Sequence, residues 1–282
     1  MRSWHALGAA TLARVPRLPF AIDARRVGSI AAAHLPALRR LDREGALRFD
    51  AAGVELATPA AQRDAAFATL NVRLREDGLI RAWRDEIFPV VDPATLETLA
   101  RFERAAARFW GTLTFGAHAT GFVAGPDGRP QALWIARRSL TKATDPGLYD
   151  NLIGGGVPAG QSPAEALVRE AFEEAGLLPQ QLQAVRPTGI LRLARDLAEG
   201  FQHEWLHAYE LELPPGLQPR NQDGEVDSFH LLAPTAALEI AAGPGMTVDA
   251  ALVTIDFALR HRLVQDEAAR RAIDALRVAT PA

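Results

Sequence analysis

The stretch "GGGVPAGQSPAEALVREAFEEAGL", residues 154–177, constrains the fold most, because a glycine-rich turn leads directly into a helix. Ser162 is a natural N-cap, Pro163 fits the first helical position, and Glu165 can return to the Ser162 backbone as a capping-box acid. Gly176 is placed to end the helix as its C-terminal cap. The sequence therefore predicts a helix that starts at Pro163 and stops before Gly176.

The same helix carries Glu170, Glu173 and Glu174, three and four residues apart, with few cations beside them. Like charges at this spacing cost a helix roughly 0.2–0.5 kcal/mol per pair. Arg169 is nearby, but it is expected to pair with Glu165 at the i,i+4 spacing. At about 100° per residue, the acids share a face with Ala166 and Leu177. The opposite face is expected to be buried and consists of Ala164, Leu167, Val168, Ala171, Phe172 and Ala175.

A divalent metal ion would explain the uncompensated acids, because Mg²⁺ prefers carboxylate oxygens and shares phosphate oxygens with a substrate. Gly154, Gly155, Gly156 and Gly160 would let the backbone pass close to a metal or a phosphate. The alternative is a solvated surface helix after a loop. The pattern thus predicts a metal–phosphate site, with that alternative open.

The chain has 282 residues, 48% hydrophobic and 23% charged, which favours two domains of an ordinary soluble globular protein. No apolar run approaches the ~18–20 residues of a membrane span, and the N-terminal residues lack a secretory signal, so a cytoplasmic protein is expected. The absence of cysteine excludes disulfides, cysteine-ligated metals and a thiol nucleophile. A net charge of −3 gives no case for nucleic acid. Nothing indicates an oligomeric state.

The first part of the chain reads as a mixed α/β domain over residues 1–112. Apolar residues recur at helical intervals in residues 27–49, 60–80 and 94–110, with Gly45 and Gly78 as stops for the first two. Residues 47–57 resemble a short hairpin, and residues 83–91 a strand. The character of the chain changes near Gly111, where we place the boundary.

The second domain is expected over residues 113–282. A Gly-Pro-Asp-Gly turn at residues 125–128 joins two strand-like runs into a hairpin. Further strands are predicted at residues 187–194 and 204–214, after the acidic helix. Helical periodicity returns in residues 247–264 and 266–279.

Residues 155–177 resemble the Nudix box, G-x5-E-x7-R-E-U-x-E-E-x-G-U, where U is apolar. The matching residues are Gly155, Arg169, Glu170, Ala171, Glu173, Glu174, Gly176 and Leu177. The first glutamate of the box is Gln161 here. Glu165 either replaces that glutamate or serves only as the capping acid.

Longer segments are similar to one Nudix subfamily, the thiamine-pyrophosphokinase-related hydrolases. They include "LIRAWRDEIFPV", "FERAAARFWGTLTFGAHATGFV" and "LWIARRSLTKATDPGLYDNLIGGGVPAG". The resemblance implies a Nudix α/β/α sandwich with a mixed sheet, preceded by a smaller mixed α/β N-terminal domain. It also implies metal-dependent hydrolysis of thiamine diphosphate, or of its oxidised derivatives, to the monophosphate and phosphate, as metabolite repair. A nucleotide-sugar or ADP-ribose-type pyrophosphohydrolase and a catalytically silent Nudix regulator are the alternatives.

By the same resemblance, the metal ligands are Glu170, Glu173, Glu174 and the Gly154 carbonyl, and the cofactor is Mg²⁺, with Mn²⁺ as a substitute. One of these carboxylates, or Glu225, would be the general base, although Glu225 could also be a solvated turn acid. Arg169 is expected to orient a glutamate of the box through an ion pair.

Cations and rings elsewhere could contact the small-molecule diphosphate substrate. Arg137 and Lys142 are candidates for its phosphates, and because Arg137 and Arg138 are neighbours in a strand, at most one of them should point inward. His203 and His207 share strand parity and could bind a metal, but packed or exposed histidines are the simpler reading. Candidates for ring stacking, each also a core candidate, are Trp83, Trp110, Trp134 and Trp205. The N-terminal domain is a candidate to close over the substrate.

Overall fold

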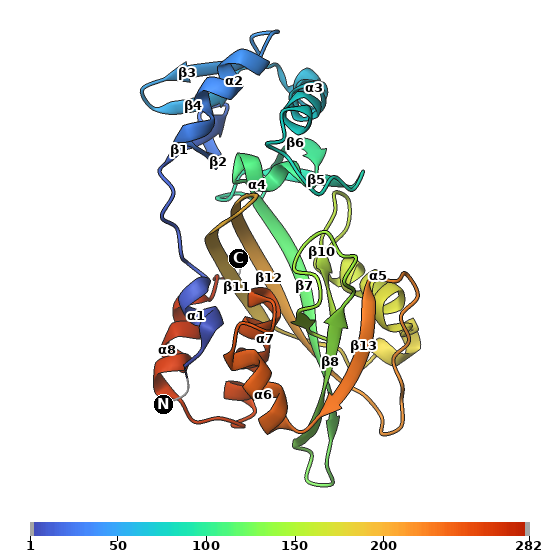
Figure 1. Cartoon of the computed structure of the whole chain (residues 1–282). Helices are drawn as coiled ribbons and strands as arrows, with labels where there is room; N and C mark the ends of the chain where they lie inside the picture. The colour runs from blue at the N-terminus through green and yellow to red at the C-terminus, as the bar shows by residue number, and fades with distance from the viewer. Residues whose placement is uncertain (1–2, 280–282) are drawn as a thin grey trace.

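The computed structural model describes residues 3–279 (Figure 1). Its N-terminal part contains a four-stranded sheet with the order β2-β1-β4-β3, in which β1 pairs antiparallel with β2 and parallel with β4. The strands are β1 (Arg17–Ile22), β2 (Arg25–Ala31), β3 (Leu47–Asp50) and β4 (Gly53–Leu56). The helices beside them are η1 (Ala32–His34), α2 (Leu35–Leu41), η2 (Ala60–Gln62) and α3 (Arg63–Glu76). Phe20, Phe67 and Trp110 pack together in the core of this part.

A separate two-stranded sheet, β5 (Ile87–Val91) and β6 (Thr98–Glu103), and the short helix α4 (Ala106–Trp110) follow. Two predicted helices are therefore wrong in part: residues 27–31 belong to β2, and residues 98–103 belong to β6. Strand pairing overrides the local pattern in both places. Gly28 lies so close to α4 that an added Cβ would come within 2.3 Å of the Trp110 carbonyl oxygen, which explains the glycine in β2.

The larger sheet has seven strands in the order β11-β12-β7-β8-β13, with β10 on β7 and β9 on β8. It is mixed, since β12 and β7 are parallel and the other pairs are antiparallel. The strands are β7 (Leu113–Ala124), β8 (Pro130–Arg138), β9 (Tyr149–Asp150), β10 (Ile153–Gly156), β11 (Arg186–Leu197), β12 (Gly200–Glu212) and β13 (Val226–Leu232).

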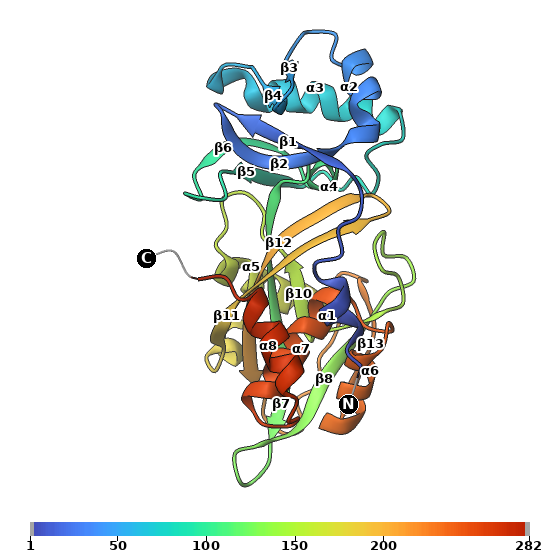
Figure 2. The same cartoon turned by 90° about the vertical axis from the view of Figure 1, so that its left-hand side faces the viewer.

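Helices cover both faces of this sheet, as the two views show (Figures 1 and 2). One face packs on α5 (Pro163–Ala175), with η3 (Pro179–Leu182) nearby. The other face packs on α6 (Pro234–Ala242), α7 (Val248–Arg260) and α8 (Glu267–Leu276). This α/β/α sandwich with a mixed sheet confirms the predicted fold class. Three elements predicted from the sequence are also present: the hairpin of β3 and β4, helix α3, and the hairpin of β7 and β8.

The N-terminal helix α1 (His5–Ala9) lies against α7 rather than on the four-stranded sheet. Ala6 and Ala10 are buried in the core of the larger sheet, so the chain starts on the sandwich before it enters the N-terminal sheet. The division at residue 112 remains a proposal. Within residues 3–279, none of the helices combines the length and the apolarity that a membrane crossing requires.

Candidate active site

Helix α5 begins and ends where its sequence predicts. The Ser162 hydroxyl accepts a hydrogen bond from the Glu165 N–H at 3.2 Å, and the Glu165 carboxylate accepts one from the Ser162 N–H at 2.7 Å. Gly176 ends the helix in the left-handed conformation, with φ of 64°. Because Glu165 is exposed and engaged in the capping box, the expected pair between Glu165 and Arg169 is wrong.

The buried face of α5 differs from the predicted one. Glu170 and Glu174 are only 8% and 5% exposed, whereas Val168 and Phe172 are 40% and 50% exposed. The reason is tertiary, because the helix packs under the glycine-rich strand β10, which leaves room there for two carboxylates. The residues buried on this face are Ala166, Leu167, Glu170, Ala171, Glu174 and Ala175. An amphipathic helix that buries acids and exposes a phenylalanine indicates a functional site.

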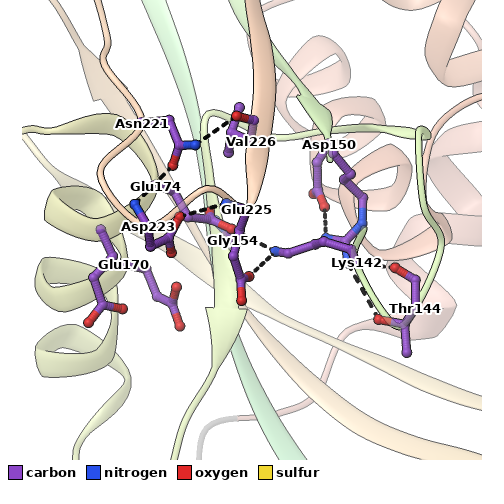
Figure 3. A network of polar contacts seen from close by, with 12 residues as sticks. Lys142, Thr144, Asp150, Gly154, Glu170, Glu174, Asn221, Asp223, Glu225 and Val226 are labelled. Atoms are coloured by element: carbon purple, nitrogen blue, oxygen red, sulfur yellow. Dashed lines mark hydrogen bonds and ion pairs between the residues drawn. The ribbon is translucent and has the colours of Figure 1, made fainter. Parts of the chain in front are cut away.

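Glu174 lies between the backbone of β10 and a lysine from the loop after β8 (Figure 3). Its carboxylate accepts hydrogen bonds from the Gly154 N–H at 3.0 Å and from the Lys142 ammonium at 3.1 Å. Lys142 also forms an ion pair with Glu225, which lies just before β13. The structure therefore brings together Lys142, Glu174 and Glu225, three of the predicted site residues.

Glu170 occupies the space that a side chain at Gly155 would need. A Cβ added to Gly155 would lie 2.0 Å from Oε1 of Glu170, so only glycine is compatible with this carboxylate beneath the strand. The same oxygen forms an ion pair with the Arg169 guanidinium at 2.9 Å. The glycine at this position is therefore explained by close packing of the backbone on an acid.

Arg169 links the acids to the glycine turn. Its guanidinium contacts Glu173 at 2.7 Å and donates to the Gly156 carbonyl and to the Gln161 side chain, each at 3.3 Å. The expected ion pair with glutamates of the box is present. Gln161, at the position of the missing first glutamate, contacts this arginine.

Burial dominates the electrostatics of the two inner acids. It raises the pKa of Glu170 to about 7, against the opposing effect of Arg169 and Arg104. It likewise raises the pKa of Glu174 to about 7, with Lys142 opposing the rise and Glu170 adding to it. Partial burial also acts to raise the pKa of Glu225, but its hydrogen bond and ion pair with Lys142 outweigh that effect, and the pKa is lowered. The inner acids are thus incompletely compensated by the cations around them.

A hard divalent cation fits this donor set. Across residues 3–279, no group of three or more His, Asp or Glu side chains stands ready around a common point. The carboxylates are paired instead with Arg169 and Lys142. Carboxylate oxygens are nevertheless the ligands such a cation prefers. The Gly154 N–H donates to Glu174, so the backbone of β10 at Gly154 lies beside this acid.

The structure does not bring Arg137 to the acids. Its side chain is exposed, donates to the Gly147 carbonyl at 3.3 Å and lies over Tyr149. Arg138 faces the opposite side of the sheet, as strand alternation requires, and pairs with Asp150 at 2.8 Å. Lys142 is the predicted phosphate contact that lies in the cluster.

The predicted tryptophans and histidines mostly serve the packing. Trp110 and Trp134 are buried in the cores, and Trp83 donates to Asp85. Trp205 meets Phe115 edge to face. His207 borders a cavity, described next, and burial lowers its pKa and that of His203.

A cavity of about 310 Å³ lies between the hairpin of β5 and β6 and the glycine turn. Residues from both parts of the chain line it, among them Pro89, Val91, Thr98, Phe115, Pro158, Gln161 and His207. Gln161 connects it to Arg169 and so to the acids. The cavity has the size and mixed lining of a small-molecule site.

Sequence reasoning missed two arginines, Arg84 and Arg104, which the N-terminal part contributes. Arg84 approaches Glu225 to 3.8 Å. Arg104 pairs with Glu86 at 2.8 Å and acts electrostatically on Glu170. The only sequence signal was that the two arginines lie in segments that resemble the Nudix subfamily, "LIRAWRDEIFPV" for Arg84 and "FERAAARFWGTLTFGAHATGFV" for Arg104.

Comparison with known families gives two matches along the chain. Residues 114–250 match the model of the NUDIX domain, and residues 5–114 match a domain of unknown function, DUF4743. The chain is 36% identical over 207 residues to "Nudix hydrolase 24, chloroplastic" and 37% identical over 207 residues to "Nudix hydrolase 20, chloroplastic", both from Arabidopsis thaliana. The chain therefore contains a Nudix domain.

Each of these alignments covers 73% of this chain but only 56% and 54% of the relatives, so the chain spans about half their length. Among solved structures, the crystal structure of DR0079 from Deinococcus radiodurans aligns with a TM-score of 0.45 and 25% identity, over 60% of this chain and 97% of that one. The compartment of this chain stays a prediction, since both Arabidopsis relatives are named chloroplastic.

Proposed function

We propose that this chain, because it contains a Nudix domain, is a metal-dependent pyrophosphohydrolase that cleaves a small-molecule diphosphate. The observation that carries the proposal is the burial of Glu170 and Glu174 beneath the glycine strand, where burial raises the pKa of both to about 7. Two acids buried next to each other cost folding free energy. A divalent cation bound by these carboxylates would offset that cost.

Glu170, Glu173, Glu174 and the Gly154 carbonyl would hold Mg²⁺ or Mn²⁺. When bound, the cation would neutralise phosphate charge and lower the pKa of water in the site. Lys142, which lies beside Glu174 and Glu225, would bind a phosphate oxygen through a charge-assisted hydrogen bond. Arg169 contacts both Glu173 and the Gly156 carbonyl, and so would fix the position of Glu173 relative to the glycine turn.

Glu225 is the proposed general base. Its lowered pKa keeps it ionised at neutral pH, and its ion pair with Lys142 places it beside Glu174. It would accept a proton from the attacking water as the new P–O bond forms and the bridging P–O bond breaks, which releases phosphate from a terminal diphosphate. Glu225→Gln should therefore lower kcat while leaving metal affinity unchanged.

Thiamine diphosphate, or one of its oxidised forms, is the proposed substrate. The proposal rests on the resemblance of the longer segments to thiamine-pyrophosphokinase-related hydrolases. The 310 Å³ cavity supports it, since Phe115 and His207 offer rings to a heteroaromatic group and Gln161 links the cavity to Arg169. The product would be thiamine monophosphate or its oxidised counterpart.

The test is release of phosphate or of a monophosphate from a panel of thiamine diphosphate, its oxo and oxy forms, ADP-ribose, NADH and nucleoside diphosphates, with Mg²⁺ and with Mn²⁺. Glu174→Gln is the inactive variant, and Glu165→Gln, on the same helix but exposed, is its matched control. Turnover of the thiamine compounds that only Glu174→Gln abolishes supports the proposal. Preference for ADP-ribose moves the enzyme to another substrate class, and binding without turnover makes the chain a regulator.

A further inference from the structure

The cations around the acids differ in how well the protein pairs them. Lys142 is bonded to Glu174, Arg138 to Asp150, Arg104 to Glu86 and Arg169 to Glu173. Arg84 differs, because its guanidinium donates no hydrogen bond to any group within residues 3–279, and its nearest acid oxygen, on Glu225, is 3.8 Å away.

This guanidinium is partly withdrawn from water, with 24% of its side chain exposed. Burial, and then the nearby Arg104, lower the pKa of Arg84, while Glu225 opposes them. Arg138 also acts on it unfavourably. Within residues 3–279, this half-buried guanidinium is repelled by other arginines and has only the 3.8 Å ion pair with Glu225. Its five donors are therefore available to bind an anion.

The backbone holds Arg84 in this position. Glu103 is 6% exposed, and its two carboxylate oxygens accept from the N–H groups of Arg84 and Glu86 at 2.9 and 3.0 Å. Ala82 and Asp85, on either side, have φ of 58°. Left-handed conformations of non-glycine residues cost free energy and persist where the surroundings impose them, often at functional sites.

We propose that Arg84 binds a phosphate group of the diphosphate substrate, so that the N-terminal part of the chain supplies one wall of the active site. This inference rests on the proposed function for the identity of the ligand. The planar guanidinium suits two phosphate oxygens at once. Its position beside Glu225 and Lys142 places such a phosphate next to the proposed base and the metal-binding acids.

The test measures binding rather than turnover. Methylene diphosphonate, a diphosphate that cannot be hydrolysed at its bridge, is titrated by calorimetry into the full chain with Mg²⁺. Arg84→Gln should weaken its affinity about tenfold or more, as loss of a charge-assisted contact predicts. Arg81→Gln is the matched control, because Arg81 lies in the same loop but is exposed and, among residues 3–279, bonds only to the Gly78 carbonyl. This variant should change the affinity less than about twofold.

The same substitution made in a Glu225→Gln variant distinguishes a direct contact of Arg84 with phosphate from an effect of Arg84 on Glu225. In Glu225→Gln, the added change Arg84→Gln should still weaken binding about tenfold. Loss of that effect overturns the inference, as does binding by Arg84→Gln within about twofold of the parent, or no binding by the parent. Melting curves of Arg84→Gln and Arg84→Lys check that the chain folds.

The two proposals can fail separately. If the parent binds the diphosphonate through Arg84 but hydrolyses nothing in the substrate panel, the inference stands and the proposed activity fails. If the parent hydrolyses a diphosphate and Arg84→Gln binds and turns over normally, the activity stands and the inference fails.

Discussion

Helices α5 and α7 flank the same sheet, and each has 13 residues, but they bury different chemistry. α7 buries nearly all of its residues, and its one buried acid, Asp256, is bonded to Arg260 at 3.0 Å and to Arg277 at 2.5 Å. α5 buries Glu170 and Glu174, whose pKa burial raises to about 7, while half of the Phe172 side chain is exposed. α7 thus buries apolar side chains and a paired acid, whereas α5 buries two acids that the surrounding cations compensate incompletely.

Replacing Glu170 by glutamine should produce the largest effect. It should lower the catalytic activity and leave the stability of the protein nearly unchanged. With a panel substrate and Mg²⁺, we expect kcat/KM to fall about 10³-fold, or about 4 kcal/mol, as for removal of one essential polar group in an active site. The free energy of unfolding of the metal-free protein should change by less than about 1 kcal/mol, because an amide of the same shape replaces a poorly compensated buried charge. A loss of stability comparable to the loss of activity would contradict the comparison.

Replacing Leu252 of α7 by alanine should do the reverse. Leu252 is fully buried, and the cavity should lower the free energy of unfolding by about 3 kcal/mol, measured by urea denaturation. The kcat/KM of the folded enzyme should stay within about twofold of the parent. A large change in kcat/KM would mean that α7 also shapes the site.

Adding a divalent metal ion should offset the loss of stability that we attribute to the buried acids of α5. At a Mg²⁺ concentration about thirty-fold above its Kd, we expect the free energy of unfolding to rise by about 2 kcal/mol, and EDTA should reverse the gain. The matched variants are Glu174→Gln, which should lose the gain, and Glu165→Gln, which should keep it. Equal gains in all three proteins would place the metal elsewhere.

The smallest effect is expected at Phe172, the exposed aromatic residue of α5. Because half of its side chain is already in water, Phe172→Ala should lower the free energy of unfolding by about 1 kcal/mol or less. A cost near that of a core phenylalanine, about 3–5 kcal/mol, would contradict the orientation of α5. Thermal melts of this variant and of Leu252→Ala, run side by side, provide the measurement.

Local features of the chain were predictable from the sequence because they depend on neighbours along it. The capping box of Ser162 and Glu165, the stop at Gly176 and the turns of the hairpins need no distant partner. The spacing of Glu170, Glu173 and Glu174 likewise indicated a shared site through the resemblance to the Nudix box. The fold class followed only from the resemblance of this motif and the longer segments to the Nudix family.

Only the tertiary structure decided which surfaces meet. Glu170 and Glu174 of α5 are buried because the glycine strand β10 leaves room for them. The spacing of apolar residues along a helix does not reveal which element packs opposite it. Residues 27–31 and 98–103 are strands because each pairs antiparallel with the strand just before it, β1 or β5, and the spacing of apolar residues alone does not reveal that pairing. Arg84 lies 3.8 Å from Glu225, although the two residues are 141 positions apart in the sequence. A contact at this separation depends on the tertiary fold and cannot be predicted from a local sequence pattern.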